Sequence, residues 1–290
     1  MRPPYPVDLV PLLPQFLTRR RTKLDHVLRM SDELGLDRLA YLVGVNLRQF
    51  PGGATLDDIL GPYVTKRDLR DAALAAAEGA GLIQRRGDRW TQTAKGRDHA
   101  ARLRRAAHEH FATLRTIDDG DLRRLAGLLE RAFETVAAAP APAHERLPRV
   151  RAVRADGAPP NALAALEDAV NALWLMRDDC HVAAWRDAGF DGPRVDVLTR
   201  IWRDEAKTVE ELASKVPQGP EDVRAQVDLL RRDRLVERDA PLRLTAEGTR
   251  VRQRIEDETD RYFFTPWPDE VGRDAAWLAD RLSAVNAALA

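Results

Sequence analysis

The feature that most constrains this chain is one local pattern that occurs twice. The first copy reads GLIQRRGDRWTQTAKG at residues 81–96, and the second reads RLVERDAPLRLTAEG at residues 234–248. Each copy has a Leu-Ile or Leu-Val pair, a charged turn, a short strand-like stretch and a Thr-Ala-(Lys or Glu)-Gly step. Sliding the chain by about 152 residues also places Phe111 on Phe263. The repeat therefore continues beyond the local pattern and indicates two related units.

The domain organisation follows from length and composition. The chain has 290 residues, about the length of two ordinary domains. Residues 137–160 are rich in Ala and Pro and lack an amphipathic period, which is typical of a stiff, extended linker. We therefore expect an N-terminal unit at 1–138, a linker at 139–160 and a C-terminal unit at 161–290.

The apolar spacing predicts the same order of elements in both units. In the C-terminal unit, helical spacing over 161–188 and 195–202 is followed by a capping box, Thr208 with Glu211, that opens a short helix. Another helical pattern, the hairpin copy and a long helix come next. In the N-terminal unit the corresponding stretches are an opening helix around 36–42, a short helix at 55–60 and a helix at 65–78. Two short helices, a hairpin and a long helix are the order of a winged helix-turn-helix.

The C-terminal unit carries a family resemblance over residues 190–265. The residues that carry it are Glu211-Leu212-Ala213, Val223 with Val227, Leu230, Leu235-Val236-Glu237-Arg238 and Leu244-Thr245-Ala246-Glu247-Gly248. In these residues the unit resembles the MarR-type winged-helix family. A family glycine is replaced by Arg234, at a position that often needs a left-handed backbone, so we expect this turn to differ.

The resemblance implies a function as well as a fold. MarR-like proteins are DNA-binding regulators that dimerise through their terminal helices, and they often bind small aromatic ligands between the long helices and the wing domain. The implied fold class is mainly α with small β-wings. It consists of two tandem winged helix-turn-helix units with long flanking helices, related by a pseudo-two-fold axis. Four helices are candidates for a dimer-like interface made within one chain: 15–34, 119–138, 161–188 and 269–288.

Charge is balanced overall but unevenly distributed. Lys plus Arg equals Asp plus Glu at 46 each, whereas a nucleic-acid binder usually has a basic face. Residues 84–105 hold eight basic side chains against two acidic ones. The expected DNA contacts of the N-terminal unit are the first turns of its second helix and the wing tip: Thr65, Lys66, Arg67, Arg70, Arg85, Arg86 and Arg89. The alternative is a solvated surface on which Arg67 and Arg70 pair with Asp58, Asp68 or Asp71.

The C-terminal unit is expected to contact DNA less well. Its second helix starts with Glu221 and Asp222, which favour the helix dipole but repel phosphate. Its candidate DNA contacts are Arg224, Arg231 and Arg232. We predict a weak or lost DNA reader in this unit.

The residues give no catalytic pattern. The sequence has no Gly-rich phosphate loop, no His-Glu-x-x-His and no nucleophile motif, so we expect neither an enzyme nor a cofactor. His108 and His110 lie on different helix faces and make poor metal ligands. The single cysteine, Cys180, excludes an internal disulfide, and a buried structural role is favoured over redox sensing. Trp174, Trp185 and Trp202 either line an aromatic ligand pocket or belong to the core.

These observations favour a cytoplasmic DNA-binding transcriptional regulator with double-stranded DNA as its partner. No apolar run approaches the length of a bilayer span, and the N-terminus lacks the pattern of a signal peptide. Acting as a monomeric pseudo-dimer and forming a homodimer both remain open. The alternative function is a winged-helix scaffold that binds a small molecule or a protein instead of DNA.

Overall fold

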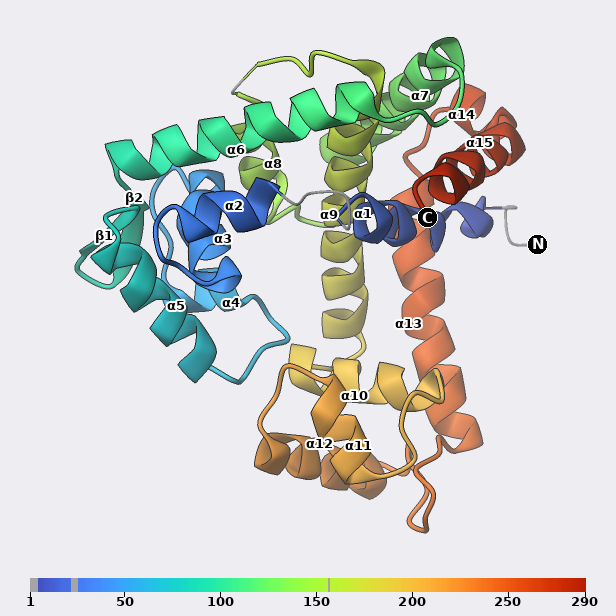
Figure 1. Cartoon of the computed structure of the whole chain (residues 1–290). Coiled ribbons are helices and arrows are strands. Elements are labelled where there is room, and N and C mark those ends of the chain that lie inside the picture. Colours follow the sequence, from blue (N-terminus) through green and yellow to red (C-terminus); the bar gives the residue numbers. More distant parts are fainter. Residues whose placement is uncertain (1–4, 22–25, 156) are drawn as a thin grey trace. The chain divides into compact units, whose positions relative to one another are not determined.

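The computed structural model describes residues 5–21, 26–155 and 157–290, and these residues are mostly helical (Figure 1). Its α-helices are α1 (Leu12–Arg21), α2 (His26–Asp32), α3 (Arg38–Asn46), α4 (Leu56–Leu60), α5 (Asp68–Gly79), α6 (Ala94–Thr113), α7 (Asp119–Ala138), α8 (Leu147–Arg154), α9 (Ala162–Asp187), α10 (Gly192–Trp202), α11 (Val209–Lys215), α12 (Pro220–Arg232), α13 (Ala246–Phe264), α14 (Asp269–Arg273) and α15 (Ala275–Ala288). Strands β1 (Ile83–Arg86) and β2 (Arg89–Gln92) form an antiparallel hairpin. The expectation of a mainly α fold with a small β element is confirmed.

Contacts divide the chain into two compact units. The larger unit comprises Met1–Gly53, Ala73–Cys180 and Asp260–Ala290, and the smaller unit comprises Ala54–Ala72 and His181–Thr259. Helices α5, α9 and α13 each continue from one unit into the other. This division does not coincide with the expected boundaries at 138 and 161, because residues 54–72 pack with α10–α12 from the other half of the chain.

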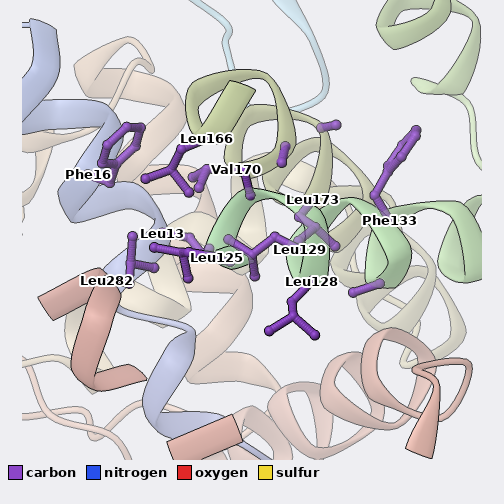
Figure 2. Close-up of a cluster of buried hydrophobic side chains, with 14 of the residues drawn as sticks. Leu13, Phe16, Leu125, Leu128, Leu129, Phe133, Leu166, Val170, Leu173 and Leu282 are labelled. Atoms are coloured by element: carbon purple, nitrogen blue, oxygen red, sulfur yellow. The ribbon is translucent and has the colours of Figure 1, made fainter. Parts of the chain in front are cut away.

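The core of the larger unit is built from helices far apart in sequence. Helix α7 has a continuous buried stripe because its apolar residues recur every three or four positions. Figure 2 shows where this stripe meets α1, α9 and α15: Leu13, Phe16, Leu125, Leu129, Leu166, Leu173 and Leu282 are all buried there. The four helices expected at a dimer-like interface therefore share one core. Residues 22–25 of the predicted helix 15–34 lie outside the described residues, and the flanking parts form α1 and α2.

The first copy of the repeated pattern joins the hairpin to α6. Thr93 is the N-cap of α6, and its Oγ1 accepts a hydrogen bond from Gly96 N at 3.0 Å. The Thr93 N–H donates to Leu82 O at 3.0 Å, and its hydroxyl donates to Gly81 O at 2.6 Å. Gly96 lies so close to the hairpin that a Cβ on it would be 2.0 Å from Leu82 O. The Thr-x-x-Gly spacing thus caps the helix and allows it to approach the backbone.

The second copy makes the same contacts at the start of α13. Thr245 N donates to Leu235 O at 3.0 Å, and Gly248 N donates to Thr245 Oγ1 at 3.0 Å. A Cβ on Gly248 would be 2.0 Å from Leu235 O. Arg234 has a side chain that disfavours the left-handed backbone conformation. It nevertheless has φ +57°, close to the +75° of Gly81 in the first copy. The expectation that the turn at Arg234 differs is therefore wrong, because the surrounding hydrogen bonds impose the left-handed conformation on Arg.

The second hairpin is less regular than expected. Its arms are joined by an isolated antiparallel bridge between Val236 and Leu244 and by a hydrogen bond from Glu237 N to Arg243 O at 2.9 Å. Pro241 lies in this hairpin and has no N–H with which to extend a ladder. The second of the two expected β-wings is therefore a loop with one bridge.

The segment expected to be an extended linker contains a packed helix. Helix α8 occupies Leu147–Arg154, and Val150 on it is buried. The Arg146 N–H donates to Asp179 Oδ2 at 2.9 Å, and the Arg146 guanidinium pairs with Asp178 at 2.7 Å. The expectation of an unpacked linker over 139–160 is wrong at α8, because Val150 is buried and Arg146 forms ion pairs with α9.

Candidate nucleic-acid interface

The hairpin β1–β2 presents arginines on both strands. Arg85 faces Trp90 and Arg86 faces Arg89 in the strand register, and all three arginines are exposed. The Arg85 guanidinium lies 5.1 Å from the centroid of the Trp90 ring, and Arg85 Nε donates to Gly87 O at 3.0 Å. These contacts orient the Arg85 guanidinium without placing it in an ion pair.

The start of α6 continues this basic surface. Lys95 and Arg97 are exposed, and each donates to a backbone carbonyl rather than to a carboxylate: Lys95 to Ala80 O at 2.7 Å and Arg97 to Gln92 O at 3.0 Å. We call the five residues Arg85, Arg86, Arg89, Lys95 and Arg97 the wing patch. The prediction of a basic face over 84–105 holds for this part of the segment.

Two basic residues farther along α6, Arg102 and Arg104, are only partly exposed and do not belong to the patch. Arg102 pairs with Glu33 at 2.9 Å, and Arg104 pairs with Asp168 at 3.6 Å and donates to Val153 O at 2.9 Å. These guanidiniums are engaged in holding neighbouring elements together. The continuous positive face is therefore shorter than the sequence pattern suggests.

Helix α5 begins later than expected and has a different exposed face. It starts at Asp68, so Thr65, Lys66 and Arg67 lie in the preceding loop and not on its first turns. Arg67 pairs with Asp57 at 2.8 Å, and Arg70 is half-buried. The exposed side chains of α5 are acidic or apolar: Asp68, Leu69, Asp71, Ala72, Ala75 and Glu78. Leu69 is 67% exposed, an unusual value for leucine.

The predicted DNA contacts on α12 are largely matched with acids of the same helix. Arg224 pairs with Glu221 at 2.8 Å, and Arg231 pairs with Asp228 at 3.7 Å. Such exposed pairs contribute little stability, but they cancel the local positive charge. Arg232 is exposed at the end of the helix. That this unit is the poorer DNA reader stays a prediction.

The three candidate pocket tryptophans lie in separate environments. Trp174 is half-buried against the core of the larger unit. Trp185 is buried, with its ring 6.3 Å from that of Tyr63, and Trp202 lies beneath the Arg252 guanidinium at 4.8 Å. None of these three indoles lines the cavity described in the next paragraph.

A cavity of about 470 Å³ lies elsewhere in the smaller unit. Phe190, Leu235, Val251 and Ile255 form its apolar part, and Arg194 and Arg254 are among its charged lining residues. The Arg194 guanidinium stacks on Phe190 and pairs with Asp233. No sequence pattern indicates this cavity, because its lining residues come from helices α9, α10 and α13 and from the segments that follow α9 and α12.

Cys180 is fully buried on α9, and burial raises the pKa of its thiol to about 12. The prediction that Cys180 is buried is confirmed. Among the described residues, no group of His, Cys, Asp and Glu side chains is arranged to hold a metal ion.

Comparison with known proteins supports the helix-turn-helix interpretation in general terms. In the described part of the chain, no helix combines the length and apolarity needed to cross a membrane. No curated protein and no solved structure matches the sequence. Residues 72–290, about three quarters of the chain, match the model of a helix-turn-helix family. The matched range includes the hairpin β1–β2, both helices α11 and α12, and both copies of the Thr-x-x-Gly step. The chain belongs to this helix-turn-helix family.

Proposed function

We propose that this protein is a non-enzymatic, DNA-binding transcriptional regulator and that it contacts DNA chiefly through the wing patch. The observation that carries the proposal is the set of five exposed cations on the hairpin and the first turn of α6, three of them on a two-stranded wing. Arginine guanidiniums suit phosphate oxygens and narrow minor grooves. The family match to helix-turn-helix proteins supports the same class of function.

The two repeat copies support a tandem arrangement of winged helix-turn-helix units. Both copies form the same capping hydrogen bonds and the same glycine-to-carbonyl approach. In the proposal, the two fused units replace the two subunits of a MarR-like dimer, and the shared core of α1, α7, α9 and α15 replaces the intersubunit interface. Light scattering should then give the mass of a single chain, 32.5 kDa. A mass twice as large would contradict the pseudo-dimer.

The face of α5 limits what this unit reads in a major groove. It offers neither Arg, Lys, Asn nor Gln on its exposed positions. Leu69 and Ala72 are suited to apolar contact with thymine methyl groups. Sequence readout is therefore expected to be modest, with most affinity coming from phosphate contacts.

A binding assay with matched variants tests the proposal. Fluorescence anisotropy on labelled genomic fragments at 50 mM salt should show binding by the wild-type chain. The double variant Arg86→Ala/Arg89→Ala should weaken it at least about tenfold. Arg224→Ala and Arg232→Ala remove equal charge from α12 and should have little effect. Absence of salt-sensitive binding by the wild type would contradict the proposal.

A second candidate function is ligand binding by the smaller unit, favoured by its cavity. The cavity has an apolar part and two arginines, which fits a small aromatic ligand carrying an anionic group. Titration calorimetry with a panel of aromatic carboxylates should detect binding that Arg254→Ala weakens. Arg250→Ala, an exposed cation one turn away that pairs with Glu247, is the matched control. Equal loss in both variants would indicate non-specific charge attraction.

A further inference from the structure

Within the smaller unit, a segment of the first repeat is hydrogen-bonded to the turn of the second helix-turn-helix. The backbone N–H groups of Thr65 and Lys66 both donate to Pro217 O, at 3.0 and 3.3 Å. Pro217 lies in the turn between α11 and α12. One carbonyl of that turn is therefore occupied by the loop that precedes α5.

The side chain of Thr65 continues the contact to the beginning of α12. Its Oγ1 accepts a hydrogen bond from the N–H of Gly219, the N-cap residue of α12, at 3.1 Å. The same hydroxyl donates to Asp222 Oδ2 at 2.6 Å. Thr65 thus satisfies the N–H of the N-cap residue, the group that a side chain at the third helical position satisfies in a capping box.

A close approach on α10 fixes the same loop. A Cβ on Gly192, the first residue of α10, would lie 1.9 Å from the carbonyl oxygen of Pro62. No side chain fits between these two backbones. The loop 61–66 is therefore held at both α10 and the α11–α12 turn.

The atoms engaged by this loop are those that a DNA-reading helix-turn-helix would present. Such a motif uses the N-terminal part of its second helix for base contacts and free N–H groups there for phosphate. Here Gly219 N and Asp222 are bound to Thr65, and the adjacent exposed carboxylate of Glu221 repels phosphate. We infer that the second helix-turn-helix binds the loop 61–66 of its own chain in the position where a DNA reader binds DNA. It thereby anchors the start of α5 and is not a second reading head.

Hydrogen exchange on the full chain without DNA tests the internal contact. Asp222→Ala and Thr65→Val should each make the amides at positions 65 and 66 exchange about five- to tenfold faster than their intrinsic rates predict from the wild type, as expected for loss of one or two hydrogen bonds. Glu221→Ala removes the same charge from the same helical turn without touching Thr65, and it should leave those rates unchanged. Unchanged rates in both Asp222→Ala and Thr65→Val would overturn the inference.

A second experiment measures hydrogen exchange with DNA added and tests whether the second helix-turn-helix contacts DNA. Only this experiment rests on the proposed function. Adding a bound genomic fragment should slow exchange in peptides covering 83–97 and leave peptides covering 219–228 unchanged. Slower exchange over 219–228 would overturn the assignment of the second motif as a non-reader. If the chain binds no DNA, the proposed function fails while the exchange result without DNA still decides the internal contact.

Discussion

Gly96 is the residue on which the packing of α6 against the first hairpin depends most directly. A Cβ there would lie 2.0 Å from Leu82 O, a backbone atom that cannot rotate away. Glycine to alanine normally stabilises a helix interior by up to about 1 kcal/mol. At Gly96 the overpacking should dominate, and Gly96→Ala should lower the free energy of unfolding by at least about 2 kcal/mol in urea denaturation. Gly272→Ala, in α14 with no atom within 4 Å of the added Cβ, is the control and should not destabilise.

Arg234 is held in a conformation that L-residues avoid. Its φ of +57° costs about 1 kcal/mol relative to glycine. Arg234→Gly should therefore raise the free energy of unfolding by up to about 1 kcal/mol, after the larger entropy of the unfolded glycine chain is deducted. Gly81→Ala, at the equivalent position of the first copy, should change it in the opposite direction. Destabilisation by Arg234→Gly would show that the arginine side chain makes a contact that outweighs the backbone strain.

Cys180 should be chemically inert in the folded protein. With a thiol pKa of about 12, roughly 1 molecule in 10,000 carries a thiolate at pH 8, and the sulfur is inaccessible as well. A thiol reagent such as DTNB should therefore label the native chain only at the rate at which it unfolds. The same chain in denaturant should react within minutes. Fast labelling under native conditions would contradict this prediction and favour a redox-sensing role for Cys180.

At the scale of elements, the sequence predicted best where structure is local. The two Thr-x-x-Gly steps form as expected because their hydrogen bonds span only a few residues or one hairpin. The helix predicted at 65–78 begins only at Asp68, and Thr65 bonds to Asp222 on α12. No pattern within the N-terminal half indicates a partner 157 residues away.

The position of helix α8 also depends on partners distant in sequence, and substituting Arg146 tests this dependence. Arg146 is buried and pairs with Asp178 and with the buried Asp179, so Arg146→Ala would leave the Asp179 carboxylate buried without this cation. We expect a loss of about 3 kcal/mol in the free energy of unfolding, measured by denaturant titration. Arg151→Ala removes an exposed arginine from α8 itself and should cost less than about 0.5 kcal/mol. Equal effects would mean that α8 is not fixed by the Arg146 ion pairs.

At the scale of the whole molecule, the balanced net charge does not indicate the exposed cations of the wing patch. The sequence located the basic segment 84–105, but it could not show that Arg102 and Arg104 are engaged with Glu33 and Asp168. It also could not show that the exposed face of α5 is acidic and apolar. Which cations remain exposed depends on tertiary packing. The net charge of zero does not indicate which side chains these are.

The salt dependence of DNA binding measures how many of these cations meet phosphate. If the five side chains of the wing patch make the contacts, the slope of log K against log salt should be no steeper than about −4.5. Arg86→Ala/Arg89→Ala should reduce the slope by about 2, whereas Arg224→Ala should leave it unchanged. Anisotropy titrations between 50 and 200 mM salt give both values. A slope near −8 would require phosphate contacts beyond the wing patch, and an unchanged slope in the double variant would remove the wing from the interface.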